Sequence, residues 1–162
     1  MLISVTDANL KTVANGGGVG KSDGTDIVFT KLDHEIESYN ASTGQFIGWV
    51  RIPALSPTAD TVIYAYYGNA SASNQQNATG VWDSNYVGVF HLPNGTTLNA
   101  NDSSVNAVSL TNSGAAATSG IIDGAGSFNS DLSLGITTGT SMNVNGNITM
   151  EAWYKRCIGI QG

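Results

Sequence analysis

The first half of the chain alternates short runs of β-branched and aromatic residues with stretches of turn-forming residues. The apolar runs cover residues 26–30, 34–39, 45–52 and 61–67. The separator at 40–44, Asn-Ala-Ser-Thr-Gly, has the composition of a tight turn. No helical period extends far enough through these residues to compete with the strand pattern. The pattern therefore predicts strands that pair into an antiparallel sheet.

Alternation within two of these runs indicates which side chains share a face of the strand. In 61–67 both faces are apolar, which predicts a strand in the centre of a β-sandwich. In 45–52, Trp49 and Arg51 share one face, and Arg51 indicates that this face reaches solvent at one end. We therefore expect Trp49 to be among the more exposed aromatic side chains.

The second half of the chain has shorter apolar runs and longer polar connections. Residues 70–80 contain no apolar residue larger than alanine, so we place a boundary between two modules near residue 80. The small-residue stretch 113–120 is expected to be a loop. The sequence thus predicts an all-β protein, with an antiparallel β-sandwich module at 1–80 and a second β module at 81–162. Strand-like runs of this second module lie at 86–92, 108–112, 126–128, 132–136 and 147–155.

Three blocks of the first module resemble one known family. They are residues 22–30, 35–40 and 62–69, with Trp-Val-Arg-Ile-Pro at 49–53 between the second and the third. These blocks, in this order, are similar to the hallmark blocks of domain of unknown function 2341. The resemblance covers roughly residues 1–80 and implies a β-sandwich.

The second module resembles a different family. Residues 81–92, Val-Trp-Asp-Ser-Asn-Tyr-Val-Gly-Val-Phe-His-Leu, are similar to the start of concanavalin A-like or laminin G-like lectin domains. This resemblance implies that 81–162 is the N-terminal part of a jelly roll. Later stretches that agree with this resemblance are 102–106, 123–129 and 148–155.

Residues 148–155 would lie near the middle of such a jelly roll. The resemblance implies that Trp153 is packed, so that replacing it with alanine should cost about 3–5 kcal/mol. A sheet that stops soon after this strand would have unpaired edges. We therefore expect either a fragment of a longer protein or strands supplied by another chain.

Composition and charge narrow the classes of partner. Charged residues make up 11% of the chain, and twelve acidic residues outnumber six basic ones, for a net charge of −6. No basic stripe is present to neutralise phosphates, so nucleic-acid binding is not expected. No apolar run approaches the length of a membrane span. Low charge with many Gly, Asn, Ser and Thr residues favours an extracellular, cell-surface or virion-surface location.

Glu35 and Glu37 are the strongest candidates for catalysis. Their i, i+2 spacing on one strand face puts the carboxylates about 7 Å apart, within the range of glycosidases. Catalytic carboxylates normally flank a sugar from opposite sides, however, whereas two on one strand more simply form a solvated face. His91 is expected to be a hydrogen-bonded structural residue. The sequence therefore predicts a protein that is not an enzyme.

Calcium is a possible cofactor, bound by loops of the second module. Asp102, Ser103, Asn106 and Asp131 offer the carboxylate, hydroxyl and amide oxygens that this hard cation prefers. Asp, Asn and Ser also fill turns for backbone reasons alone, so this assignment stays open.

Trp49, Arg51 and Tyr86 are the residues that we expect to bind a ligand, because flat aromatic rings and polar groups make lectin surfaces. The sequence favours a binding or adhesion module that recognises a glycan or another surface polymer within a larger extracellular or virion protein. One alternative is a structural subunit of a virion, tail appendage or extracellular filament, whose partners are other copies of itself or the rest of a longer chain. A second alternative is a polysaccharide-active enzyme that uses Glu35 and Glu37.

Overall fold

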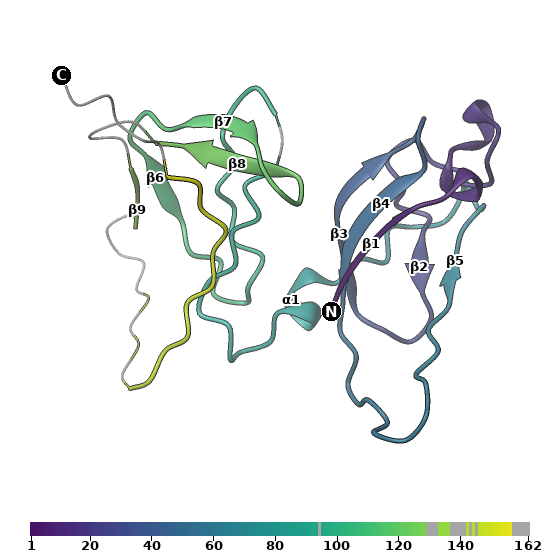
Figure 1. Ribbon diagram of the computed structural model, residues 1–162, viewed down its shortest axis with the longest axis horizontal. Coiled ribbons are helices and arrows are strands. Elements are labelled where there is room, and N and C mark those ends of the chain that lie inside the picture. The colour runs from purple at the N-terminus through teal and green to yellow at the C-terminus, as the bar shows by residue number, and fades with distance from the viewer. Residues whose placement is uncertain (94, 129–132, 137–141, 143, 145, 157–162) are drawn as a thin grey trace.

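The regular structure of the protein is almost entirely β, as a computed structural model of the chain shows (Figure 1). Two lobes are joined by the one-turn helix α1 (Ala78–Val81). We call residues 1–77 the N-terminal lobe and residues 82–156 the C-terminal lobe. The structure describes residues 1–93, 95–128, 133–136, 142, 144 and 146–156.

A three-stranded antiparallel sheet forms one layer of the N-terminal lobe, with strand order β1-β4-β3. The turn between β3 and β4 follows from its sequence, because the Asn40 side chain accepts hydrogen bonds from the backbone of Ser42 and Thr43. Gly44 completes the turn in the left-handed region, at φ 73°. The strands are β1 (Leu2–Thr6), β3 (His34–Asn40) and β4 (Gln45–Val50).

The second, two-stranded sheet of this lobe pairs β2 (Val28–Phe29) with β5 (Ala65–Tyr66). Phe29 of β2 and Phe46 of β4 meet in the core, with ring centroids 5.9 Å apart. The other core side chains that are almost fully buried are Val19, Ile27 and Val50. Two 3₁₀ turns, Ala8–Leu10 and Val13–Asn15, follow β1.

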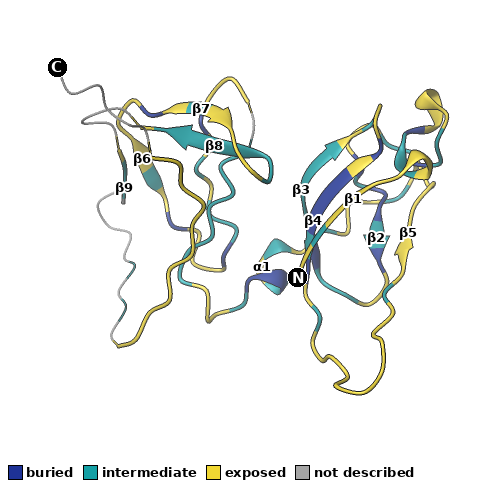
Figure 2. Ribbon diagram, in the orientation of Figure 1, coloured by how far each residue is buried: buried dark blue, intermediate teal, exposed yellow. Residues whose placement is uncertain are grey.

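The C-terminal lobe contains two separate pairs of short antiparallel strands. Its described residues include fewer buried side chains, and Figure 2 shows the contrast with β4, most of which is buried. The first pair is β6 (Leu110–Asn112) with β9 (Leu134–Ile136), and the second is β7 (Ala116–Ser119) with β8 (Gly124–Ser127).

The strands predicted at 34–39 and 45–52 are confirmed with small shifts of their ends, whereas other predictions were wrong. Only Ala65–Tyr66 of 61–67 is a strand, and Tyr64 and Tyr66 are exposed, so this segment is not central. The expected loop at 113–120 contains β7, because small Ala, Thr and Ser side chains still allow backbone pairing.

The strand expected at 147–155 is absent, because the described residues 146–156 form no strand. The prediction that Trp153 is buried was wrong, since its side chain is 79% exposed. Residues 86–92 form no strand either and contribute only the isolated bridge Phe90↔Asp102.

Within the described ranges, no helix has both the length and the apolar character that crossing a bilayer requires.

Candidate functional site

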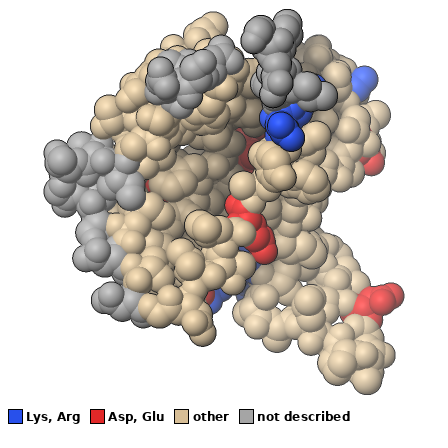
Figure 3. All heavy atoms as spheres, turned by 60° about the vertical axis from the view of Figure 1, so that its left-hand side comes forward, with Lys and Arg blue, Asp and Glu red and all other residues tan. Residues whose placement is uncertain are grey.

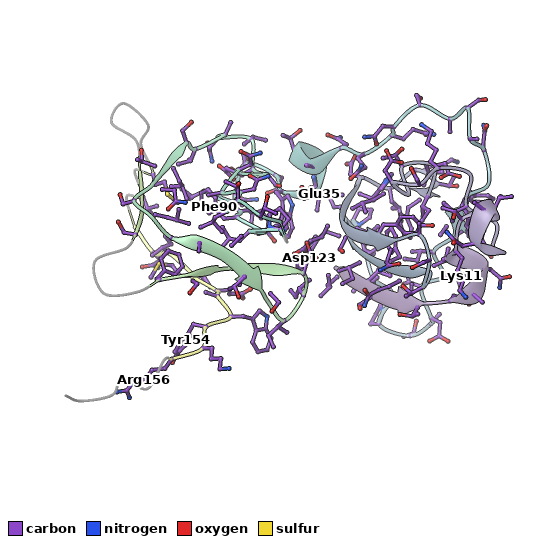
Figure 4. The ribbon with its side chains drawn as sticks, turned by 90° about the horizontal axis from the view of Figure 1, so that it is seen from above. Lys11, Glu35, Phe90, Asp123, Tyr154 and Arg156 are labelled. Atoms are coloured by element: carbon purple, nitrogen blue, oxygen red, sulfur yellow. The ribbon has the colours of Figure 1, made fainter. Side chains whose placement is uncertain are left out.

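The best candidate for a functional site lies at the junction of the two lobes. Because side chains alternate along a strand, Glu35 and Glu37 of β3 lie on the same face of the sheet. That face is turned toward the C-terminal lobe, and Figure 4 shows Glu35 between the two lobes. Both carboxylates are largely buried there, with side chains 14% and 3% exposed.

His91 of the C-terminal lobe pairs with both carboxylates. Its Nε2 atom lies 3.1 Å from Oε2 of Glu35, and its Nδ1 atom lies 3.3 Å from Oε2 of Glu37. A protonated imidazole donates from both ring nitrogens, so it satisfies two carboxylates at once. The result is an ion-pair triad that bridges the lobes.

Three further side chains donate hydrogen bonds to the same carboxylates. Trp82 Nε1 donates to Glu35 Oε2 at 2.6 Å, and Ser103 Oγ donates to Glu35 Oε1 at 2.5 Å. Trp49 Nε1 donates to Glu37 Oε2. We call Glu35, Glu37, Trp49, Trp82, His91 and Ser103 the junction cluster.

The indole rings of the cluster also pack against each other. The ring centroids of Trp49 and Trp82 are 4.9 Å apart and edge to face. The His91 ring lies 5.7 Å from Trp82 and 6.0 Å from Trp49, which is within cation–π range. Aromatic packing and ion pairing therefore join the lobes at the same place.

The charges of the cluster reinforce one another. Burial opposes the charged form of His91, but the hydrogen bonds that His91 donates to Glu35 and Glu37 outweigh this effect and raise the pKa of His91 to about 9. Burial likewise opposes ionisation of Glu35, but hydrogen bonds from His91, Ser103 and Trp82 hold the pKa of Glu35 below its ordinary value. At neutral pH, His91 is therefore charged and Glu35 is ionised.

Local sequence around α1 positions Trp82. Asn77 caps the helix, because its side-chain oxygen accepts from the backbone N–H of Gly80. The Asn77 amide donates to Asp33, and the Asn77 backbone N–H donates to the carbonyl of His34. The start of β3 and the start of α1 are thus tied together, which places Trp82 over Glu35.

On the other side of the cluster, Asp102 sets the position of Ser103. One carboxylate oxygen of Asp102 accepts from the backbone N–H of Val89 at 2.8 Å, and the Ser103 N–H donates to the Val89 carbonyl. Phe90 and Asp102 form the bridge between these segments. The bridge brings His91 beside Ser103.

The structure brings the three predicted ligand-binding residues to the junction. Trp49 is half-buried under Trp82 rather than exposed, because its indole bonds a carboxylate, whereas Tyr86 packs edge to face on Trp82 at 5.0 Å and is 45% exposed. Arg51 forms an exposed ion pair with Asp83 at 3.1 Å. Their role in ligand binding stays a prediction.

The structure shows hydrogen-bond partners for three of the four predicted calcium ligands. Asp102 accepts hydrogen bonds from three backbone N–H groups and from the hydroxyl of Ser104. Asn106 donates to two backbone carbonyls, and Ser103 donates to Glu35. Asp131 lies outside the described residues. Among the residues searched, no group of three or more His, Cys, Asp or Glu side chains could hold a metal ion. Calcium stays a prediction.

Beside the cluster lies a cavity of about 120 Å³. Its wall combines apolar surface from two residues with amide, hydroxyl, carboxylate and imidazole groups. The lining residues are Ile36, Glu37, His91, Pro93, Asn99, Asn101 and Ser103.

Sequence reasoning named Glu35, Glu37 and His91 but did not connect them. Two features of the sequence could have indicated that they interact. The two carboxylates share one strand face, and the histidine lies within the apolar run 86–92, where a charged or polar ring needs a partner. Nothing in the sequence indicated that Trp82 donates to Glu35, because the two residues are far apart along the chain.

One comparison with known proteins gives a match. The family described as Domain of unknown function (DUF2341) matches residues 23–107, just over half of the chain. The whole junction cluster falls within this range. No curated protein and no solved structure matches the chain. The likeness of residues 81–162 to laminin G-like domains stays a prediction.

Proposed function

The chain belongs to the family of domain of unknown function 2341 over residues 23–107, and from this premise we propose that it is a non-catalytic binding module for a neutral, hydroxyl-rich polymer such as a glycan. The observation that carries this proposal is the cavity beside the junction cluster, whose wall has both polar and apolar groups. We place the protein on an extracellular, cell or virion surface, in keeping with its low charge and polar composition.

The lining of the cavity suits one edge of a sugar unit. Sugar hydroxyls both donate and accept hydrogen bonds, and the amides of Asn99 and Asn101 do the same. Ile36 and Pro93 offer apolar surface for the C–H groups of the ring. At about 120 Å³ the cavity is smaller than a usual small-molecule site, so it fits part of a polymer rather than a whole free ligand.

Charge favours a neutral polymer over an anionic one. In the cavity wall the charged imidazole of His91 is already paired with the carboxylate of Glu37, and the chain has a net charge of −6. The face shown in Figure 3 is mostly neither acidic nor basic, with charged side chains scattered over it.

The protonation states of the cluster support a non-catalytic role. With a pKa of about 9, His91 holds its proton at neutral pH and is a poor general base. The lowered pKa of Glu35 keeps it ionised, so it is a poor general acid. Release of reducing ends from a polysaccharide, lost when Glu35 and Glu37 are both replaced by glutamine, would contradict this role.

We also propose that the two sheets of the N-terminal lobe form a β-sandwich and that the C-terminal lobe is part of a jelly roll. In support, Phe29 and Phe46 from the two N-terminal sheets meet in one core. The C-terminal lobe has two short, separate strand pairs, as expected if they belong to a larger sheet.

Binding of the full chain to a glycan array, followed by calorimetry on a hit, tests the proposed function. Asn99→Ala should weaken binding about tenfold, because it removes an amide from the cavity wall. Asn69→Ala is the matched control, since each asparagine oxygen accepts a backbone N–H two residues on, at 3.0 Å. Equal affinity of the two variants, or no bound glycan, would overturn the proposal.

A structural role in an assembly is the second candidate function, favoured by exposed apolar side chains on unpaired segments. Tyr64 and Val62 are more than 60% exposed beside the short strand β5, and Tyr154 is 90% exposed. Such side chains fit the contact surfaces of a filament or virion. Size-exclusion chromatography with light scattering separates the two candidates, because a stable monomer at high concentration would contradict the assembly role.

A further inference from the structure

The cavity of the proposed function lies between the two lobes rather than within either of them. Ile36 and Glu37 of its wall come from β3 of the N-terminal lobe. The rest of the wall comes from the C-terminal lobe and consists of His91, Pro93, Asn99, Asn101 and Ser103. The cavity therefore exists only while the lobes are docked, so the contacts that hold the lobes together also control this site.

Glu35 receives three hydrogen bonds across the lobe boundary. Trp82, His91 and Ser103 of the C-terminal lobe contact its two carboxylate oxygens at 2.5–3.1 Å. Glu37, whose side chain is only 3% exposed, meets the other nitrogen of His91 at 3.3 Å. These charged groups lie largely away from water, so they favour docking only while they are paired with one another.

Each lobe has buried side chains of its own, so the lobes can part without unfolding. The buried core residues of the N-terminal lobe, from Val19 to Val50, all belong to that lobe. In the C-terminal lobe, Leu98, Val108 and Ala115 are buried. The link between the lobes is the one-turn helix α1 (Figure 1). Short segments of this kind commonly act as hinges.

We propose that Glu35, Glu37 and His91 form a latch that keeps the lobes closed over the cavity, and that the lobes part about α1 when the latch is broken. The latch needs a proton on His91, because only the charged imidazole donates from both nitrogens. Loss of that proton leaves two buried carboxylates against a neutral ring, and water can solvate them once the lobes separate. Glu35 and Glu37 are the titratable groups that act on His91 among the described residues. The aromatic rings packed on His91, Trp49 and Trp82, carry no charge.

The latch adds a control to glycan binding, and only this consequence rests on the proposed function. A polymer in the cavity would touch both lobes, so binding and closure would stabilise each other. The affinity for the glycan should then fall about tenfold for each pH unit above 9, because closing the latch takes up one proton.

Small-angle X-ray scattering of the full chain without ligand, at pH values on both sides of 9, tests the latch. We expect the radius of gyration to rise with a midpoint near pH 9. Tryptophan emission should move to longer wavelength as Trp49 and Trp82 meet water, while far-UV circular dichroism stays unchanged. Return to neutral pH should restore the compact form. A constant radius of gyration through pH 9, or a rise only together with loss of the β-sheet signal, would overturn the proposal.

Variants at the latch and beside the hinge sharpen the test. The ordinary pKa of lysine is about 10.4, so His91→Lys should move the midpoint of opening up by about one pH unit. His91→Gln carries no charge and should be open already at neutral pH. Asp83→Asn is the matched control, because it breaks the exposed interlobe ion pair with Arg51 and should leave the midpoint unchanged. An unchanged midpoint in His91→Lys would overturn the proposal even if His91→Gln fails to fold.

Scattering and the glycan array can fail independently of each other. Opening near pH 9 with no glycan bound at any pH would support the latch and overturn the proposed function. A bound glycan without any opening of the lobes would do the reverse.

Discussion

The N-terminal and C-terminal lobes each hold their loops with one aspartate, yet they differ in what surrounds it. Asp26, 2% exposed, accepts hydrogen bonds from the backbone N–H groups of Gly20, Lys21 and Gly68. Asp102 likewise accepts from three backbone N–H groups and from one hydroxyl. The same device therefore organises the loops of both lobes.

The difference lies in the apolar core beside each aspartate. In the N-terminal lobe, β2 and the six-residue strand β4 bring the large side chains of Phe29 and Phe46 together in one core, with their rings tilted against each other. In the C-terminal lobe, the strands have three or four residues, and the buried side chains include Ala115 and Val108. A buried aspartate can fix a loop, but apolar strands are needed to build a core. The C-terminal lobe accordingly depends more on the junction cluster.

The largest effect should come from the core of the N-terminal lobe. Replacing the almost fully buried Phe46 with alanine should lower the free energy of unfolding by about 3–5 kcal/mol. Leu98→Ala is the matched change in the C-terminal lobe and should cost about 2 kcal/mol, because small neighbours can close around the space. Denaturant unfolding measures both losses of stability. An equal loss in the two variants would mean that the cores of the two lobes do not differ as we propose.

Replacing either of the two aspartates should have the next largest effect on the free energy of unfolding. Asp26→Ala should cost about 3 kcal/mol, because it leaves three backbone N–H groups without their acceptor. Asp102→Ala should cost about 2 kcal/mol, because its loops are more exposed and water can replace the carboxylate. Thermal unfolding followed by circular dichroism gives the order, and the reverse order would mean that the C-terminal lobe depends more on its aspartate.

The junction cluster should contribute about 2 kcal/mol to the free energy of unfolding, and this contribution should depend on pH. The folded-state pKa of His91 is raised from 6.5 to about 9, so its contribution is complete below pH 6.5 and is lost as pH rises through 9. The pKa of Glu35 is lowered from 4.5, so its contribution is present above pH 4.5 and is lost on acidification.

Stability from the cluster should therefore be greatest between pH 4.5 and 6.5. Urea unfolding across pH measures this dependence, with His91→Gln as the comparison. The variant should lose the decline between pH 6.5 and 9. If both proteins show the same decline, His91 does not carry it.

The sequence predicted β3 and β4 well because their signals are local. Alternating side chains mark the strands, and Asn40 and Gly44 form the turn without help from the rest of the chain. Strand β7 was missed because its Ala, Thr and Ser side chains carry no apolar pattern. Backbone pairing with β8 stabilises it, and composition does not reveal pairing.

The junction cluster could be predicted only in part. The i, i+2 spacing placed Glu35 and Glu37 on one face, but it could not show what covers that face. His91 is 56 residues away from Glu35 along the chain, and only the folded arrangement of α1 brings it there. The solvated face that the sequence favoured is instead buried by the C-terminal lobe.

The smallest effect should come from Trp153, although its side chain is the kind that usually dominates a core. Its ring is 79% exposed on a segment without strand pairing, so Trp153→Ala removes little buried area and should cost less than about 0.5 kcal/mol. The half-buried Trp49 offers the contrasting case, because its indole packs on Trp82 and bonds a carboxylate. Trp49→Phe should cost more than Trp153→Ala even though it removes fewer atoms. Tryptophan emission should also move to shorter wavelength when Trp153 is removed, since the two remaining indoles are shielded from water. A loss above about 1 kcal/mol for Trp153→Ala would mean that this segment packs in solution, and the C-terminal lobe would then have more core than its strand pairs supply.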